Sequence, residues 1–370
     1  MVFDKELEFI ENNNLSTPIL FYSSSKIVEN LNVIKEAIFS EKVDVYYAMK
    51  SCYDSLVLDS LSSRVSGAEV MSELEFCLAE KHHFKSFILN GMGRSYDLLE
   101  RVALYPNSTI IVDSERDLEN ISKILETNPE IKNLKLGIRL IFKLDDEEYK
   151  CNNYFQLEHK LGHDISSSFC AKFFRFCSSH NRVSWDLLHT HFTINEKMPF
   201  IYQKIMQEIK QQLDKYETIY NLSPTRIDVG GGFEIYNPKE KNVFSNLFKQ
   251  IILTFNKLFP NSRLIIEPGR FLSAYSGYVI GKVLDIKNKS GKVWIVTDIG
   301  TNALIPNGNA RYCLYYPQEE VSGIKVGITD GITSPVNNII YETYLKEIPK
   351  IDSYICLLYT SPSPRDSTSS

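Results

Sequence analysis

Short apolar segments alternate with amphipathic ones through most of this chain, and this alternation constrains the fold more than any other feature. Eight segments have the length and the β-branched or aromatic content of strands: 43–50, 67–70, 86–91, 109–114, 134–141, 184–192, 225–232 and 263–269. Helix-like segments such as SERDLENISKIL lie between them. Strands that alternate with helices form parallel βαβ units, and eight such units predict a closed (β/α)8 barrel. An open, doubly wound sheet is the alternative that the pattern leaves.

The pattern changes after the eighth strand. From Phe271 the chain has β-like runs with turn signals and few helices. We therefore expect a barrel domain over residues 24–270 and a β-rich second domain over 271–355, which residues 1–23 join through PILFYS. The length of 370 residues suits a barrel plus a smaller domain. The polar segment 144–160, after the fifth strand, is expected to be an active-site loop or a disordered excursion.

The last segment, 356–370 (CLLYTSPSPRDSTSS), follows an interrupted β pattern and is rich in serine and proline. It resembles translated adapter sequence, so we expect a non-native tail on a C-terminally truncated protein. A natural disordered tail is the alternative.

Composition excludes several classes of protein. The net charge of −5 gives no sign of a nucleic-acid or anionic-membrane partner, and no apolar run reaches the length of a membrane span. The seven cysteines are scattered without a CxxC pair, which favours a reduced, cytoplasmic protein. Cysteine and histidine form no ligand cluster, so no metal site is predicted.

Lys50 stands at the end of the first strand, in YYAMK, on the face where barrel enzymes carry their catalytic groups. A lysine that emerges from an apolar strand enters a partly desolvated site, where its pKa falls and the amine becomes nucleophilic. Such an amine can form a Schiff base with an aldehyde cofactor. By itself, however, a lysine at a strand end is more often a solvated side chain.

A glycine run follows the seventh strand. Gly230, Gly231 and Gly232 let the backbone approach an anion closely and direct several N–H groups toward it. Phosphate sites in barrels commonly follow strands seven and eight. Sharp turns also use glycine, so the run is weak evidence by itself.

The eighth strand ends in IIEPGRF, with Glu267, Gly269 and Arg270. A carboxylate that faces a pyridine nitrogen keeps it protonated, and the protonated ring is a strong electron sink. Arg270 could pair with a phosphate. An ordinary ion pair at the strand end is the alternative.

His189 and His191 alternate with Thr190 at the end of the sixth strand, so they share one face. Either could stack on a planar cofactor or move protons. Glu69 and Arg139 end the second and fifth strands, and neither is informative alone.

Together these residues resemble the fold-type III pyridoxal 5′-phosphate (PLP) decarboxylases, the group that acts on ornithine, lysine, diaminopimelate and carboxynorspermidine. The resemblance covers about residues 18–340. The family's motifs occur in order: Y-A-x-K, GAEVMSELE, HxH, GGG, EPGR and VTDIG. The resemblance implies an alanine-racemase-like TIM barrel with a β-rich domain, and a homodimer whose active sites need residues from both subunits.

The resemblance also implies a role for each matching residue. Lys50 would form the Schiff base, His191 would stack on the cofactor ring, and Glu267 would meet the pyridine nitrogen. The other residues expected to bind the cofactor or support its site are Glu69, Arg139, Gly230, Gly231, Gly232, Gly269 and Arg270. Asp298 and Ser334 are tentative substrate contacts.

Three departures from the family pattern stand out. Thr193 and Ile194 replace a Gly-Ser pair whose serine binds phosphate. Ser334, in GITS, replaces the cysteine that protonates the product across the dimer interface, and Pro335 replaces an acidic residue that reads a distal amino group. The family's late tyrosine, which contacts the cofactor, has no counterpart before the odd tail.

The sequence therefore predicts PLP-dependent decarboxylation of a small amino acid, giving an amine and CO2. The departures favour a larger diamino acid or a conjugated amino acid as the substrate. Two alternatives stay open: an amino-acid racemase on the same barrel, which Glu267 argues against, and a non-catalytic PLP-binding relative.

Overall fold

The computed structural model describes residues 2–142, 160–193, 196–300, 312–331 and 339–359. Contacts divide the chain into two compact units, which we describe separately. The barrel unit is Ile27–Leu272, and the β unit is Met1–Lys26 with Ser273–Ser370. The predicted insertion at 144–160 lies outside the described residues except for Lys160.

Eight strands form the barrel, each beginning or ending within a few residues of a segment predicted from the sequence. They are β2 (Val43–Ala48), β3 (Gly67–Val70), β4 (Phe87–Leu89), β5 (Ser108–Val112), β6 (Leu134–Ile141), β8 (Val183–His189), β9 (Arg226–Asp228) and β10 (Arg263–Ile266). All neighbours pair in parallel. The pairing of β5 with β6 closes the sheet. The predicted (β/α)8 barrel is confirmed, and the open doubly wound sheet is wrong.

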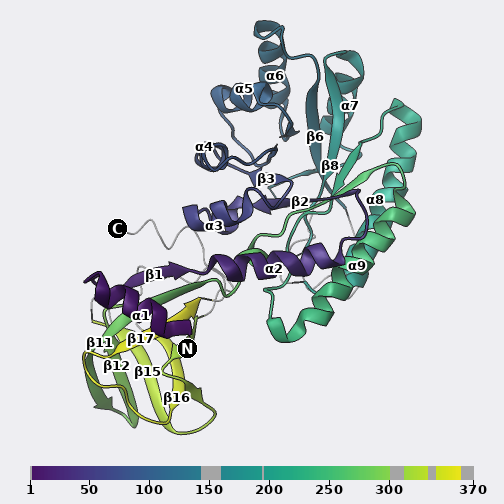
Figure 1. Cartoon of the computed structure of the whole chain (residues 1–370). Helices are drawn as coiled ribbons and strands as arrows, with labels where there is room; N and C mark the ends of the chain where they lie inside the picture. Colours follow the sequence, from purple (N-terminus) through teal and green to yellow (C-terminus); the bar gives the residue numbers. More distant parts are fainter. Residues whose placement is uncertain (1, 143–159, 194–195, 301–311, 332–338, 360–370) are drawn as a thin grey trace. The chain divides into compact units, whose positions relative to one another are not determined.

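Helices follow the strands and lie outside them (Figure 1). They are α2 (Ser24–Ala37), α3 (Ser55–Leu61), α4 (Glu73–Lys81), α5 (Tyr96–Leu104), α6 (Glu115–Thr127), α7 (Ser168–Ser179), α8 (Pro199–Tyr220) and α9 (Lys241–Leu258). Each helix from α3 to α7 begins after an Asp or Ser whose side chain accepts a backbone N–H of the first turn. These caps satisfy a donor that the helix itself cannot pair, which explains why the helices begin where they do.

An apolar layer fills the middle of the barrel. Its side chains come from alternate positions of five strands: Tyr46, Ile88, Ile111, Leu187 and Ile265. Burial of such side chains stabilises the barrel by about 1.5–3 kcal/mol each. The layer also separates the two ends of the barrel, so that the polar groups at each end form their own network.

A polar cluster lies at the amino-terminal end of the barrel. Asp186 pairs with the guanidinium of Arg226 and accepts hydrogen bonds from Thr109 (3.0 Å) and Thr225 (2.7 Å). Arg226 also donates to the hydroxyl of Tyr46 at 3.2 Å. Because each charge has a partner and further hydrogen bonds, the cluster meets the condition under which buried ions are tolerated.

The β unit is a mostly antiparallel sheet, and β12–β15 is its parallel pair. Its elements are α1 (Val2–Asn12), β1 (Ile19–Tyr22), β11 (Gly277–Lys289), β12 (Lys292–Thr297), β13 (Tyr312–Tyr316), β14 (Glu319–Glu320), β15 (Ile324–Asp330), β16 (Ile339–Leu345) and β17 (Tyr354–Tyr359). The early strand β1 pairs with β11, so the beginning of the chain belongs to this sheet. The β-rich second domain predicted from the sequence is confirmed.

The strand β17 corrects one expectation. The β pattern was expected to break off before residue 356, but β17 continues to Tyr359 and lies between β11 and β13. Cys356 and Leu357 are fully buried in the core of the unit. The hydrophobic run CLLY therefore serves as a strand. Residues 360–370 lie outside the described part of the chain.

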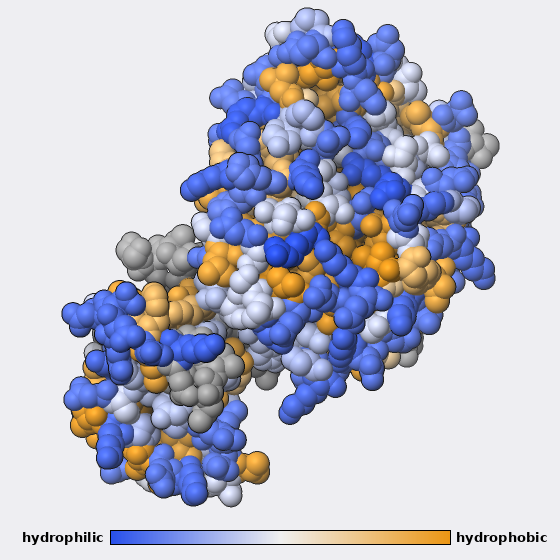
Figure 2. Space-filling model, viewed as in Figure 1, coloured by the Kyte–Doolittle hydropathy of each residue, from blue (hydrophilic) through white to orange (hydrophobic). Residues whose placement is uncertain are grey.

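Hydrophilic side chains cover much of the face shown in Figure 2, with hydrophobic ones between them. Exposed large hydrophobic residues are spread along the sequence, for example Phe39, Met198 and Leu253. Among the described helices, none combines the length and the apolar character that crossing a membrane requires.

Candidate active site

Strand register brings polar residues together at the carboxyl ends of the barrel strands. Arg139 on β6 is paired with His189 on β8, and His189 is paired with Asp228 on β9. Ala48 on β2 is likewise paired with Glu69 on β3. Residues at matched positions of parallel strands point to the same face, so the register alone predicts that these side chains share the barrel mouth.

Lys50 lies one turn beyond its strand. The strand β2 ends at Ala48, and a short 3-10 helix, Met49–Ser51, carries the lysine. Its Nζ lies 3.0 Å from Oε2 of Glu69, and its side chain keeps 40% exposure while that of Glu69 is fully buried. The amine is therefore held by a buried carboxylate and still reachable from outside.

A residue that sequence reasoning missed completes the environment of Glu69. Asn90 follows β4 directly, is buried, and donates from Nδ2 to Oε1 of Glu69 at 3.2 Å. The same Nδ2 lies 3.5 Å from Nε2 of His189. A polar residue at the end of the apolar run SFILNG was the available signal.

The pKa of Lys50 shifts in the direction opposite to the one expected. Burial, the largest single influence, lowers the pKa, but the carboxylates of Glu69 and Glu267 outweigh it and the net change is upward. Burial raises the pKa of Glu69 to about 7, although Lys50 opposes the rise. The predicted lowering is therefore wrong for the cofactor-free protein, and the Glu69 carboxylate favours the charged form of the amine.

Glu267 follows β10 and is 1% exposed. Its Oε2 lies 3.5 Å from Nε2 of His189, which is fully buried. Burial lowers the pKa of His189, so the ring is neutral at pH 7. Among the described residues, neither oxygen of Glu267 has a donor at ordinary hydrogen-bond distance.

His191 lies against the glycine turn. The backbone N–H of Gly231 donates to Nδ1 of His191 at 3.3 Å, and burial holds the pKa of the imidazole well below its usual value. The neutral ring therefore accepts at Nδ1 and carries its proton on Nε2. One N–H of the glycine run is thus occupied by the histidine.

The glycines are required by the protein itself. A Cβ on Gly231 would lie 2.2 Å from the carbonyl oxygen of Glu267, and one on Gly232, which has φ +76°, would lie 1.8 Å from that of Thr193. Thr193 in turn donates from Oγ1 to the carbonyl of Gly231 at 3.0 Å. The glycine run thus packs tightly between the backbone segments of Glu267 and Thr193. This packing explains the glycines without any bound phosphate.

Gly269 and Arg270 lie where the chain leaves the barrel. A Cβ on Gly269 would lie 2.9 Å from Cβ of Ser51, so glycine lets this turn pack against the residue that follows Lys50. Arg270 begins the short helix α10 (Arg270–Ser273). Ile194, at the position of the family's serine, lies outside the described residues.

The two tentative substrate residues belong to the β unit. Asp298 accepts from the backbone N–H of Lys282 at 2.7 Å and from the hydroxyl of Thr17 at 2.5 Å, so both of its oxygens hold elements of that unit together. Ser334 lies outside the described residues. Substrate contact by either residue stays a prediction.

The residues of the barrel mouth fit PLP. A buried carboxylate without an ordinary donor, Glu267, suits a protonated ring nitrogen. Lys50 supplies a reachable amine, and Arg139 is a cation only 8% exposed that forms no ion pair within 4 Å with a described carboxylate. A ligand with a positively charged ring nitrogen and negatively charged oxygens would supply partners of opposite charge for these groups.

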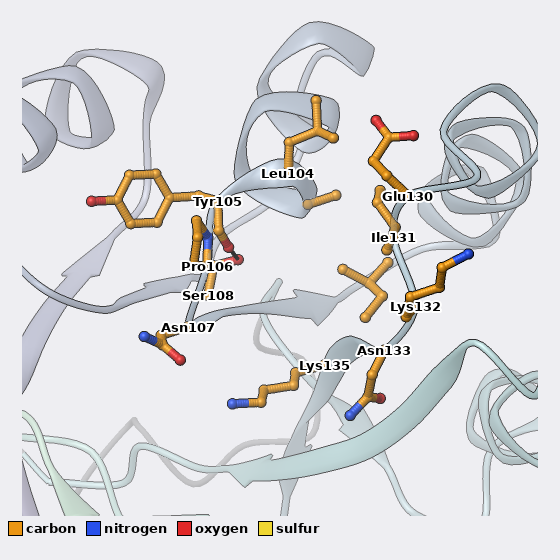
Figure 3. Close-up of a pocket in the computed structure, with 12 residues that line it drawn as sticks. Leu104, Tyr105, Pro106, Asn107, Ser108, Glu130, Ile131, Lys132, Asn133 and Lys135 are labelled. Atoms are coloured by element: carbon orange, nitrogen blue, oxygen red, sulfur yellow. Dashed lines mark hydrogen bonds between the residues drawn. The ribbon is translucent and has the colours of Figure 1, made fainter.

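A separate hollow of about 180 Å³ lies at the other end of the strands (Figure 3). Its lining includes Asn107, Glu130, Asn133 and Lys135, which come just before β5 and β6 or at the start of β6. The candidate residues lie at or beyond the other ends of their strands. None of them lines this hollow, so we do not assign the active site there.

Curated relatives of the chain are decarboxylases. It is 22% identical over 301 residues to diaminopimelate decarboxylase of Haemophilus influenzae, covering 78% of this chain and 69% of the relative. It is 24% identical over 268 residues to 2-[(L-alanin-3-ylcarbamoyl)methyl]-2-hydroxybutanedioate decarboxylase of Staphylococcus aureus, covering 70% and 64%.

Solved structures share the fold. Diaminopimelate decarboxylase of Methanocaldococcus jannaschii has a TM-score of 0.82 at 20% identity and covers 98% of this chain and 86% of that one. Lysine decarboxylase of Selenomonas ruminantium has a TM-score of 0.79 at 17% identity, covering 98% and 92%. At this identity the likeness supports the two-part fold.

The family model described as "pyridoxal-dependent decarboxylase, pyridoxal binding domain" matches residues 24–274. The match spans the whole barrel and includes Lys50, His191, the glycine run and Glu267. The chain therefore belongs to the pyridoxal-dependent decarboxylases.

Proposed function

We propose that Lys50 holds PLP covalently at the barrel mouth, and that the substrate of this amino-acid decarboxylase carries a second polar group far from the carboxylate that is lost. The enzyme class and the cofactor follow from the family. The roles of single residues and the kind of substrate are the proposal.

The observation that carries the proposal is the environment of Glu267. A fully buried carboxylate without a donor at ordinary distance is costly unless a ligand supplies the partner. Burial tends to raise its pKa, but His189 and Lys50 outweigh burial and keep Glu267 ionised. A carboxylate held in this state is suited to hold a proton at a ring nitrogen.

Each group of the site is then proposed to have its own role. PLP supplies an aldehyde for attachment to an amine and a protonated ring that accepts the electron pair of the bond that breaks. Lys50 offers the amine, and Glu69, 3.0 Å away, holds Nζ in place. The neutral ring of His191 offers a flat face beside the glycine turn. Gly230, Gly231, Gly232 and Arg270 are proposed to bind the phosphate.

The substrate class is proposed from the relatives. The names of the matched proteins include diaminopimelate and an alanine conjugate of a hydroxybutanedioate, each with a polar group beyond the reacting amino acid. The replacements at Ser334 and Pro335 favour a substrate other than plain ornithine. We therefore propose a diamino acid or a conjugated amino acid.

A carbon dioxide assay tests this function. The purified chain with PLP is incubated with carboxyl-labelled diaminopimelate, lysine, ornithine and an amide-conjugated diaminopropionate, and released CO2 is counted. We expect release from at least one of the first and last substrates above that from ornithine. Exchange of the α-proton without CO2 release from any of them would instead identify a racemase, and neither activity would favour a non-catalytic PLP-binding protein.

We also propose a cytoplasmic homodimer with shared active sites. The proposal rests on the family resemblance and on the six described cysteines, all of which are free. Light scattering after size exclusion measures the assembly. Mixing Lys50→Ala with Ser334→Ala chains then tests sharing, because a mixed dimer can restore one intact site only if the two residues act across subunits.

A further inference from the structure

A second carboxyl lies beside Glu267. Asp228 is the last residue of β9, is fully buried, and lies close to Glu267, which is 1% exposed. One side-chain oxygen or nitrogen atom from each of Asp228, Glu267 and His189 lies within 4.8 Å of the other two. Two acidic groups therefore share one buried place next to a single histidine.

The two oxygens of Asp228 are used unequally. Oδ1 accepts the backbone N–H of Gly230 at 2.8 Å, at the start of the glycine turn. Oδ2 has no donor among the described residues, and the same is true of both oxygens of Glu267 at ordinary distance. A proton on either carboxyl would give Asp228 and Glu267 a hydrogen bond to each other.

Electrostatics decides which carboxyl holds the proton. Two neighbouring carboxylates in a buried site cannot both be ionised without a large penalty. Burial and the charge of Glu267 raise the pKa of Asp228 well above its usual value, whereas His189 and Lys50 favour the charged form of Glu267. The other charged or titratable groups around the pair include Arg139, Glu69 and His191.

Nδ1 of His189 supports the same assignment. It has no partner in the part of the chain that the structure describes, so a proton there would be a buried donor without a described acceptor. Nε2 lies 3.5 Å from Oε2 of Glu267 and 3.5 Å from the NH2 of Asn90, so a proton on Nε2 would face the carboxylate at the outer limit of a hydrogen bond. A protonated Asp228 could then donate a hydrogen bond to Glu267, which also faces Nε2 of His189.

We propose that Asp228 is a positioning residue that stays protonated and donates from Oδ2 to Glu267, while its Oδ1 fixes the glycine turn through Gly230. The proposal rests on the proposed contact of Glu267 with the ring nitrogen. Asp228 thereby connects Glu267, which is proposed to contact the ring nitrogen, to the glycine turn, which is proposed to bind the phosphate. The contacts at the two ends of the cofactor are then fixed relative to each other.

Infrared spectroscopy of the full chain without PLP gives a test that does not depend on activity. At pH 7, the wild-type minus Asp228→Asn difference spectrum should contain a carboxylic-acid C=O band that shifts in D2O. Glu267→Gln should shift the frequency of the same band, because it replaces the charged carboxylate that accepts the proposed hydrogen bond. A carboxylate band in place of the acid band would overturn the proposal.

Substitutions with PLP bound supply the second readout. Asn reproduces the protonated form, because its oxygen can accept from Gly230 and its NH2 can donate to Glu267. Asp228→Asn should therefore keep the CO2 release rate within about tenfold of wild type, whereas Asp228→Ala should lose about a hundredfold or more. Equal losses in both variants would overturn the proposal, since they would mean that the charge is needed.

A bound cation is the competing explanation for two adjacent buried carboxyls. Elemental analysis of the purified chain decides it: a stoichiometric divalent ion would overturn the proposal, because both groups would then be ionised. The infrared result also separates this inference from the proposed function. An acid band without any CO2 release contradicts the function alone, and CO2 release without the acid band contradicts the role of Asp228 alone.

Discussion

Nε2 of His189 lies 3.5 Å from Oε2 of Glu267, and both side chains are almost completely buried. His189 ends β8 and Glu267 follows β10, so β9 lies between their strands in the sheet and the two side chains meet inside the barrel. The pair defines the centre of the mouth, toward which Lys50, Asn90 and Asp228 also turn.

Replacing Glu267 by Gln should reduce decarboxylation far more than cofactor binding. The amide keeps the size of the side chain but cannot hold a positive charge at the ring nitrogen. We expect a loss of several powers of ten in the CO2 release rate, about 1.4 kcal/mol for each. PLP affinity, measured by titration of the visible band, serves as the control. An unchanged rate at saturating PLP would mean that Glu267 does not face the ring nitrogen.

Glu69 sets the pH at which Lys50 becomes reactive. The carboxylate raises the pKa of the amine, so the neutral form accumulates only at higher pH. Glu69→Gln removes this influence and should move the midpoint of PLP attachment to lower pH. The rate of appearance of the visible band, followed across a pH series, measures the midpoint.

The matched control for this change is Glu73→Gln. Glu73 lies on α4, where its side chain is 58% exposed and faces Arg101. Its removal should leave the midpoint in place. A midpoint that stays unchanged in Glu69→Gln, or rises, would contradict the assigned effect of Glu69.

The glycine turn can be tested with two glycines of similar backbone conformation. Gly232 has φ +76° and Gly291 has φ +74°, but only at Gly232 would a Cβ meet other atoms, 1.8 Å from the carbonyl of Thr193. An alanine at either position should carry the strain of left-handed backbone, roughly 1–2 kcal/mol.

We expect Gly232→Ala in addition to displace the turn and weaken PLP retention, measured as cofactor remaining after dialysis. Gly291→Ala should retain the cofactor as well as wild type does. Equal retention in the two variants would show that this turn does not help to bind PLP.

The polar cluster at the amino-terminal end of the barrel should contribute to stability rather than to catalysis. Asp186→Ala leaves the buried guanidinium of Arg226 without its partner and should destabilise the barrel unit by about 3–5 kcal/mol. Asp44→Ala breaks the more exposed pair with Arg263 and should cost less than about 1 kcal/mol.

Urea unfolding measures both changes. The chain has two tryptophans, Trp185 in the barrel unit and Trp294 in the β unit, so a Trp294→Phe background leaves a barrel reporter. Similar midpoints for the two aspartate variants would contradict the contrast between a buried and an exposed ion pair.

The strands were predictable because their signal is local. Each barrel strand is a short apolar run bounded by turns, and the register then follows from parallel closure. The residues at the strand ends, including Lys50, Glu69 and Glu267, could be identified for the same reason. The run CLLY in β17 was misjudged because serine and proline follow it closely, and only its neighbours in the sheet show it to be a strand.

Effects that depend on several strands were not predictable. The pKa of Lys50 was expected to fall, because a single strand does not reveal that carboxylates from β3 and from beyond β10 surround the amine. Asp228 was overlooked because a lone acid before three glycines looks like part of a turn. Its contact with Glu267 exists only after β9 and β10 pair.

Reduction with borohydride tests the central claim most directly. PLP is added to the full chain, the cofactor is fixed to its lysine by reduction, and the labelled peptide is mapped by mass spectrometry. We predict one labelled residue, Lys50, loss of the visible band on reduction, and no specific label in Lys50→Ala. A stoichiometric label on any other lysine, with Lys50 unmodified, would contradict the assignment.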